Sequence, residues 1–206
     1  VRWINPTISY AEKFMDHAIL ASIMRQPAVP PLDPWYAGGT LDVYYYLGYW
    51  MSGALGLTAG VPSTITFNLV LPTVLGLAAV SLYALGHLLL ERYRWLPVLA
   101  LFLPNPSAIY HIAIGDSWFD VLWGSTRTIT NTINEYPLFS MLWGDVHPHV
   151  MSFFNQGLLL FLLVFAYMRW GTLTARGRVI LSGLAALSLG SMPGFNSWDV
   201  LVYAPV

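Results

Sequence analysis

Two acidic residues near the start of the chain have a spacing that could support chemistry. Glu12 and Asp16 are four residues apart, so a helix would place both carboxylates on one face. Like charges at that spacing repel each other unless a proton, a cation or a substrate relieves them. The pair could therefore supply a general base or a ligand. An exposed polar helix face with a capping Glu is the structural alternative.

A second group of titratable residues lies in the sequence Gly144-Asp-Val-His-Pro-His-Val150. Pro148 fits the first turn of a helix, because its missing N–H would have no partner there. Asp145, His147 and His149 would then gather at the start of that helix. They could bind a divalent metal ion, or cationic imidazoles could hold a phosphate near the helix start. Interfacial histidines bonded to the backbone are the structural alternative.

Three further residues are candidates with strong local explanations. Asp33 precedes a proline, which holds it extended in a loop, but an Asp is also common in turns. Asp199 follows Asn196 by three residues, as the partner in a capping box does. Arg127 could bind a phosphate, although an ordinary surface charge would look the same.

The composition predicts that membrane helices position these residues. The chain is 56% hydrophobic and 9% charged, against about 25% charged in soluble domains, and its mean hydropathy is +0.59. Its charge-free windows are about as long as the ~20 residues that cross a hydrocarbon core, or longer. We predict an all-α polytopic membrane protein with one transmembrane domain over 1–206. The predicted spans are 62–90, 95–115, 148–169 and 179–193, with a further span starting at 198–206. Pro104-Asn-Pro106 should break the span over 95–115, so that its outer half is irregular or a separate short helix.

The same data exclude several classes of protein and of site. A net charge of −1 argues against nucleic-acid binding, which needs clustered Lys and Arg. The absence of cysteine excludes disulfides, thiolate metal sites and cysteine nucleophiles. We expect no haem, flavin or nucleotide. The missing initiator Met and the apolar last segment lead us to expect a fragment of a longer chain.

The basic residues predict which parts of the chain lie outside. The pair Arg92/Arg94 and the cluster Arg169/Arg176/Arg178 belong in the cytoplasm by the positive-inside rule. Residues 1–60 then form a large outer loop, with an amphipathic helix over 8–25 and a Tyr/Trp-rich interfacial helix within 41–60. Residues 116–147 form a second outer loop. All the candidate site residues fall on the outer face of a cell membrane.

Five motifs together resemble a known family. They are Glu12-Lys-Phe-Met-Asp16, Pro-Pro-Leu-Asp-Pro-Trp35, Tyr44-Tyr45-Tyr46, Asp145-Val-His-Pro-His149 and Asn196-Ser-Trp-Asp199. In this order they look like the "YYY" membrane proteins of Archaea and Chloroflexi. The layout, with an acidic first outer loop, an interfacial helix and a long span, is similar to the GT-C glycosyltransferase superfamily and implies a GT-C-like helical bundle.

That resemblance implies transfer of a sugar from a polyprenyl-phosphate donor to a glycan, protein or lipid acceptor outside the membrane. Glu12 or Asp16 would be the catalytic carboxylate, and because the two are not adjacent the choice between them stays open. The implied substrate-binding residues are Lys13, Asp33, Tyr44, Tyr45, Tyr46, Arg127, His147, His149 and Asp199. Mg or Mn could bind at Asp145, His147 and His149. A transporter and a non-catalytic membrane scaffold are the alternatives.

Overall fold

The computed structural model describes residues 2, 4–9 and 11–205. Within them the regular elements are helices, and the only β-type pairing there is an isolated bridge between Leu32 and Thr40. The elements are α1 (Lys13–Arg25), α2 (Leu47–Thr58), α3 (Ser63–Leu89), η1 (Leu96–Leu101), α4 (Ser107–Ala113), α5 (Trp118–Gly124), α6 (Pro137–Trp143), α7 (Pro148–Met151), α8 (Phe153–Arg169), η2 (Trp170–Thr172), α9 (Ala175–Phe195) and α10 (Ser197–Tyr203). The predicted all-α membrane class is confirmed.

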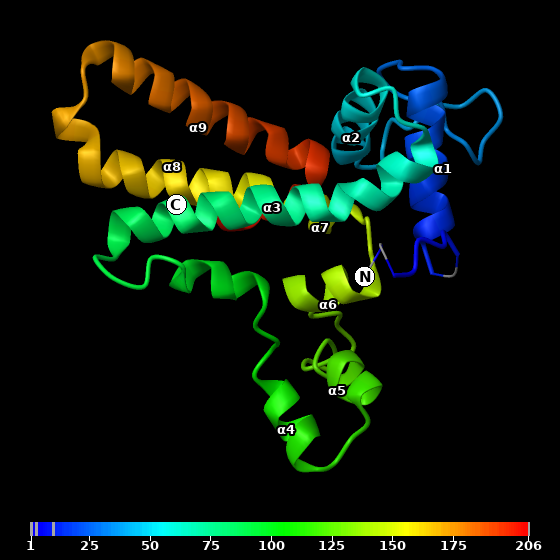
Figure 1. Cartoon of the computed structure of the whole chain (residues 1–206). Coiled ribbons are helices and arrows are strands. Elements are labelled where there is room, and N and C mark those ends of the chain that lie inside the picture. The colour runs from blue at the N-terminus through cyan, green and yellow to red at the C-terminus, as the bar shows by residue number, and fades with distance from the viewer. Residues whose placement is uncertain (1, 3, 10, 206) are drawn as a thin grey trace.

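Three helical segments are long and apolar enough to cross a membrane: Ser63–Leu89, Pro148–Thr172 and Ala175–Phe195. At ~1.5 Å per residue α3 measures about 40 Å, which exceeds the ~30 Å of a hydrocarbon core. α3 and α8 pack side by side and run in the same direction, and α9 returns against α8 (Figure 1). Each segment falls on a predicted span.

The predicted span over 95–115 is broken at Pro104 and Pro106, as the prolines predict, and a separate short helix follows. η1 ends at Leu101, α4 begins at Ser107, and Pro104 and Pro106 lie between them. Proline lacks an N–H and restricts the residue before it, so the helix is interrupted there. α4 has seven residues and spans about 10 Å, too short to cross alone. The chain instead extends away from the bundle through α4 and α5 (Figure 1).

The segments predicted to lie outside the membrane also differ in detail from the prediction. The first helix starts at Lys13 rather than at residue 8, because Ala11 has a φ of 52° and this left-handed conformation cannot continue a right-handed helix. The helix predicted within 41–60 is α2, which occupies Leu47–Thr58. α10 lies where a further span was predicted to begin.

A hydrophobic core forms where α1, α2, α3 and α7 meet. Its buried members include Ile19, Leu20, Ile23, Tyr49, Phe67, Val70, Val146, Val150 and Met151. Gly48 lets α2 lie close to α7, because a Cβ at this position would be 2.8 Å from side-chain atoms of Met151. The outer segments are thereby held against the ends of the membrane helices.

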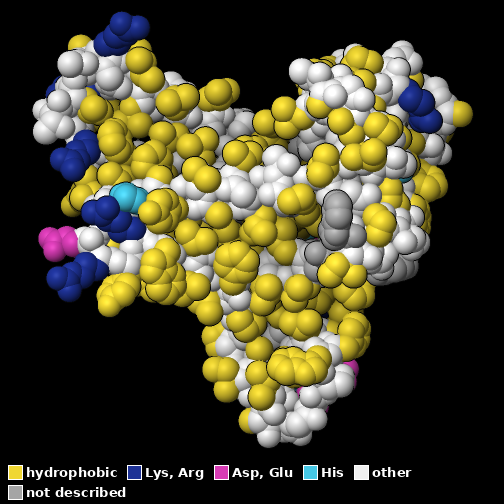
Figure 2. All heavy atoms as spheres, viewed as in Figure 1, with side chains coloured by type: hydrophobic (Ala, Val, Ile, Leu, Met, Phe, Trp, Pro, Cys, Tyr) yellow, Lys and Arg dark blue, Asp and Glu magenta, His cyan; other side chains and the backbone are white. Residues whose placement is uncertain are grey.

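The two ends of the bundle differ in charge. Arg92 and Arg94 follow α3, Arg169 ends α8, and Arg176 and Arg178 lie in the first turns of α9. Basic side chains gather at this end, and hydrophobic side chains cover much of the surface between the ends (Figure 2). The candidate carboxylates and histidines lie at the opposite end, beside the core described above.

Candidate acid–imidazole site

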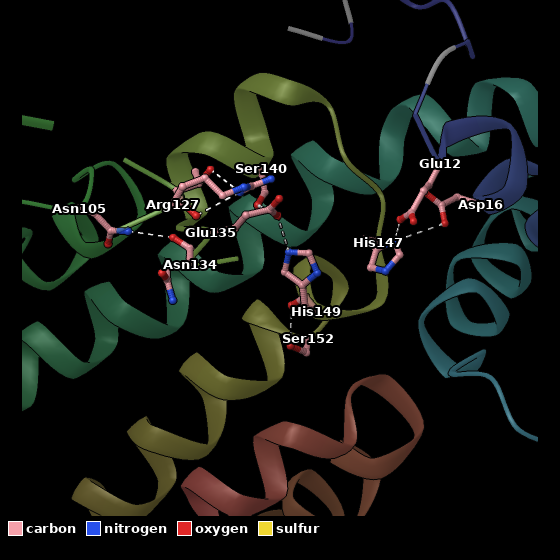
Figure 3. Close-up of polar contacts among 11 residues, drawn as sticks. Glu12, Asp16, Asn105, Arg127, Asn134, Glu135, Ser140, His147, His149 and Ser152 are labelled. Carbon is pink, nitrogen blue, oxygen red and sulfur yellow. Dashed lines mark hydrogen bonds and ion pairs between the residues drawn. The ribbon is translucent and has the colours of Figure 1, made fainter. Parts of the chain in front are cut away.

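Two segments far apart in the sequence bring the predicted residues together. The start of α1 supplies Glu12 and Asp16, and the connection between α6 and α7 supplies Asp145 and His147. His147 turns towards Glu12 and Asp16, whereas His149 turns towards Glu135 (Figure 3). The centroids of the two imidazole rings are 5.5 Å apart. The sequence therefore forms one cluster with two histidine-centred halves.

Asp16 is the buried centre of the first half. Its exposed fraction is 0%, and the Tyr49 hydroxyl donates to its Oδ1 at 2.5 Å. Burial raises the pKa of Asp16 to about 6, although the Tyr49 hydrogen bond and the nearby His147 act in the opposite direction. Its other oxygen, Oδ2, has no hydrogen-bond partner among the described residues.

Glu12 has a different environment from Asp16. Its side chain is 62% exposed, and its Oε2 lies 2.9 Å from His147 Nδ1. The same nitrogen is 3.8 Å from Asp16 Oδ1. The imidazole thus lies between an exposed carboxylate and a buried one, and only the exposed carboxylate can meet a ligand from solvent directly.

The second half pairs His149 with Glu135. His149 Nε2 lies 3.3 Å from Glu135 Oε2, and the Ser140 hydroxyl donates to the same oxygen at 3.4 Å. The bond to His149 lowers the pKa of Glu135, with a further contribution from the charge of Arg127. Glu135 is consequently held as a carboxylate by its neighbours.

Asp145 connects the two halves. Ligand atoms of Asp16, Asp145 and His147 lie within 4.8 Å of one another, and so do those of Glu135, Asp145 and His149. Burial is the largest cause that raises the pKa of Asp145. The residues predicted as one metal set, Asp145, His147 and His149, are thus divided between two sets that share Asp145.

Gly144 sets the course of the loop that carries Asp145. Its φ of +75° ends α6 in a left-handed conformation, which glycine adopts without steric cost. A Cβ here would lie 3.1 Å from Arg2 Cδ and 3.6 Å from Lys13 Cε. Lys13 is 2% exposed and its Nζ lies 5.3 Å from the centre of the Trp143 ring. Burial and the charge of Arg2 lower the Lys13 pKa.

Two apolar grooves border the segments that carry the cluster. One, of about 780 Å³, is lined by residues of α3 and α6, by Phe102 and by Arg2. Arg2 donates through Nε to Asn68 Oδ1 at 2.7 Å, and Asn68 lines the same groove. The other, of about 210 Å³, runs between α2 and α3. Arg2 therefore contacts both the larger groove and the loop at Gly144.

Several predicted residues have local roles instead. Asp33 Oδ1 accepts hydrogen bonds from the backbone N–H groups of Trp35 and Tyr36, at 2.7 and 3.3 Å, as in an Asx turn. Asp199 accepts hydrogen bonds from Gln156 and Asn196.

Arg127 lies near Glu135 but has structural partners of its own. Its guanidinium is 4.3 Å from the centre of the Trp123 ring, and Nη1 donates to Thr126 Oγ1 at 2.7 Å. The charge of Arg127 contributes to the lowered pKa of Glu135. Arg127 therefore acts on the His149 half of the cluster through the effect of its charge on Glu135.

The three consecutive tyrosines do not share one environment. The Tyr44 hydroxyl is buried, and its pKa is raised by burial and by the charge of Asp16. The Tyr45 hydroxyl lies 2.8 Å from Ser197 Oγ. Tyr46 precedes α2 as its N-cap and packs against the core. Tyr44 is therefore the tyrosine whose hydroxyl lies within reach of the charge of Asp16.

Sequence reasoning missed Tyr49 and Glu135 as members of the cluster. Tyr49 meets Asp16 across 33 residues, and Glu135 meets His149 through the packing of α6 on the following loop. The position of Tyr49 on a Tyr-rich helix beside an acidic segment was a weak signal. No spacing rule predicts either pair.

The apolar helices and the cluster at one end of them define an integral membrane protein with a carboxylate–imidazole cluster next to apolar grooves. More specifically, the chain belongs to the family described as "Uncharacterized membrane protein (DUF2298)", which matches residues 1–206. No curated protein and no solved structure matches the chain.

Proposed function

We propose that this protein is a membrane-bound glycosyltransferase of GT-C type, which moves a sugar from a polyprenyl-phosphate donor to an acceptor hydroxyl. One observation carries the proposal: Arg2 and Lys13 both approach Gly144, so cationic groups lie between an apolar groove and a carboxylate cluster. The groove suits a polyprenyl tail, the cations suit its phosphate, and the carboxylates suit an acceptor hydroxyl. The motif layout that resembles GT-C enzymes supports the same reaction.

Glu12 is the proposed general base, because it is the exposed carboxylate of the pair. It accepts the proton of the acceptor hydroxyl while the hydroxyl oxygen attacks the anomeric carbon. The bond from that carbon to the phosphate oxygen breaks, and the polyprenyl phosphate leaves with the bonding electrons. In-line attack inverts the anomeric centre. Lys13 and Arg2 stabilise the leaving phosphate by charge.

Asp16 is the proposed positioning residue for His147, which it approaches at 3.8 Å from the buried side. His147 in turn lies 2.9 Å from Glu12. Contacts on both sides hold the imidazole in place beside Glu12, and this positions the Glu12 carboxylate for the acceptor hydroxyl.

The charge distribution supports an extracytoplasmic site in a multi-pass cell-membrane protein. The arginine clusters lie at the opposite end of the helices from Glu12 and His147, and positive residues favour the cytoplasmic side. Lipid-linked sugars carried on the outer leaflet would then reach the grooves laterally.

Donor binding tests this proposal without knowledge of the acceptor. The full-length protein in detergent is heated with a panel of polyprenyl-phosphate sugars, and bare polyprenyl phosphate serves as the reference. A donor at a hundred times its Kd adds roughly 2.7 kcal/mol to the free energy of unfolding. We expect a sugar-dependent rise in Tm that His147→Gln weakens.

Turnover of the donor found in this way tests the role of Glu12. Glu12→Gln should slow donor consumption by about 10²–10⁴-fold, as expected for loss of a general base, and leave donor binding nearly intact. Asp42→Asn, at an exposed acid of the same outer segment, is the matched control. A well-folded protein whose Tm responds to no donor would refute the transferase and favour a scaffold.

A further inference from the structure

Two carboxylates and an imidazole meet at the buried side of the cluster. Asp16, Asp145 and His147 each offer a ligand atom, and these atoms lie within 4.8 Å of one another. Metal–ligand bonds of about 2.0–2.2 Å place two ligand atoms at most about 4.4 Å apart, so small side-chain rotations bring the three atoms onto one ion. The set comes from α1 and from the loop before α7, so it is assembled by tertiary packing.

An independent observation points to a missing ligand at this place. Asp16 is 0% exposed; the Tyr49 hydroxyl satisfies Oδ1, yet the buried Oδ2 has no hydrogen-bond partner among the described residues. Buried polar atoms are nearly always satisfied, and an unsatisfied one costs about 1–3 kcal/mol, or more when it is charged. A group that binds Oδ2 would remove that cost.

The charges around Asp16 favour a cation over a neutral group. Asp145 offers a ligand atom within 4.8 Å of one of Asp16, and Glu12 lies one helical turn before Asp16. A divalent ion between Asp16 and Asp145 would convert the repulsion between carboxylates into attraction to a shared charge.

We propose that Asp16, Asp145 and His147 bind one divalent transition-metal ion such as Zn²⁺ or Mn²⁺. The imidazole favours Zn²⁺ and its neighbours over Mg²⁺ and Ca²⁺, whereas the two carboxylates also suit Mn²⁺. Three protein ligands leave at least one coordination position open, as in catalytic rather than structural sites. The open position would accept a phosphate oxygen, a hydroxyl or water.

One neighbour of the set supports one of its ligands. Tyr49 donates to Asp16 Oδ1, which is the kind of contact that orients a ligating carboxylate. The alternative set is less suitable, because its carboxylate Glu135 is partly exposed and accepts from Ser140, whereas Asp16 is fully buried and its Oδ2 has no hydrogen-bond partner among the described residues. The metal is therefore assigned to the Asp16 half.

Metal titration of the full-length protein tests the site directly. The protein is stripped with EDTA in detergent and titrated with Zn²⁺ or Mn²⁺ in a calorimeter, and bound metal is measured after desalting. We expect one ion per chain. Asp145→Asn and His147→Gln should each weaken metal binding by at least about 10–100-fold, which is the loss caused even by replacing residues that only hydrogen-bond to a metal ligand. Asp42→Asn should bind as the unaltered protein does.

The variants distinguish a metal ion in the Asp16 half from one in the Glu135 half. Asp16→Asn alone would be ambiguous if it failed to fold, so the two partly exposed ligands Asp145 and His147 carry the test. No stoichiometric binding to folded protein would refute the site. So would binding that persists in both variants, or binding that Glu135→Gln removes while His147→Gln does not. Because this experiment uses no sugar donor, it can fail or succeed independently of the proposed transferase activity.

Discussion

Replacing Tyr49 by Phe removes one hydroxyl from the buried side of the cluster and leaves the ring in place. That hydroxyl donates to Asp16 Oδ1 at 2.5 Å, and both side chains have an exposed fraction of 0%, so water cannot take over the bond. A hydrogen bond to a charged group contributes about 1.5–3 kcal/mol. The pKa of Asp16 is about 6, so protonating it at pH 7 costs only about 1.4 kcal/mol.

Protonation of Asp16 therefore limits the loss of stability at neutral pH. We expect Tyr49→Phe to lower the free energy of unfolding by about 1.5 kcal/mol at pH 7, because the carboxylate that has lost its hydrogen bond can take up a proton instead. At pH 8.5 protonation of Asp16 costs about 3.4 kcal/mol, so the loss of stability should approach the full contribution of the hydrogen bond, about 3 kcal/mol. The substitution is thus predicted to be more harmful in alkaline solution.

Denaturant unfolding of the EDTA-treated protein at the two pH values measures this difference, with tryptophan fluorescence as the signal. Tyr45→Phe is the control, because its hydroxyl makes an exposed contact with Ser197 and should contribute less than about 1 kcal/mol at either pH. Equal losses in the two variants, or a loss at Tyr49 that does not grow with pH, would refute the placement of an ionisable Asp16 against Tyr49.

Three further predictions concern pH, the loop and the membrane helices. In metal-free protein the pKa of Asp16 is raised to about 6, so the folded state binds more protons than the unfolded state between about pH 4 and 6. Asp16 therefore adds stability below about pH 4, and this stability is lost as the pH rises through about 6. Asp16→Asn should flatten that part of the stability–pH curve. Gly144→Ala places an alanine in the left-handed conformation against Arg2. It should lower the free energy of unfolding by about 1–2 kcal/mol and weaken Zn²⁺ binding. Gly76→Ala is the control, because nothing lies within 4 Å of its Cβ and it should cause no loss of stability in thermal unfolding. Asn155→Ala breaks hydrogen bonds from α8 to Ser188 and Ser191 of α9 and should cost about 0.6–1.7 kcal/mol in detergent unfolding; no loss would show that these bonds do not hold the two helices together.

The membrane helices could be located from the sequence because the bilayer imposes a simple rule. A helix in hydrocarbon must lack charges for about 20 residues, and the structure has helices at Ser63–Leu89, Pro148–Thr172 and Ala175–Phe195. The rule concerns composition only. Residues 95–115 satisfy it, and the backbone chemistry of Pro104 and Pro106 predicts the break that separates η1 from α4, so both composition and proline positions are needed to place the helix ends.

The residue types of the site could be predicted, but their environments could not. Glu12 and Asp16 look alike in sequence, yet one side chain is 62% exposed and the other 0%. The difference is made by α2, which places Tyr49 over Asp16. Asp33 makes the turn contact that its position before a proline also predicts, whereas Asp199 accepts from the Asn196 side chain and no side-chain cap bond forms at Asn196. Long-range packing decides these assignments, and spacing within one segment does not contain it.

Core packing and site geometry are connected along the loop before α7. Val146 and Val150 are fully buried core residues, and the site residues Asp145, His147 and His149 alternate with them. Burial of the valines therefore fixes the directions of the histidines. The same burial removes water from Asp16 and makes its ionised form costly. A fold that buries a carboxylate beside other carboxylates is least stable when nothing neutralises them. A bound cation would remove that instability, so the metal-free protein should unfold more easily than the metal-loaded one.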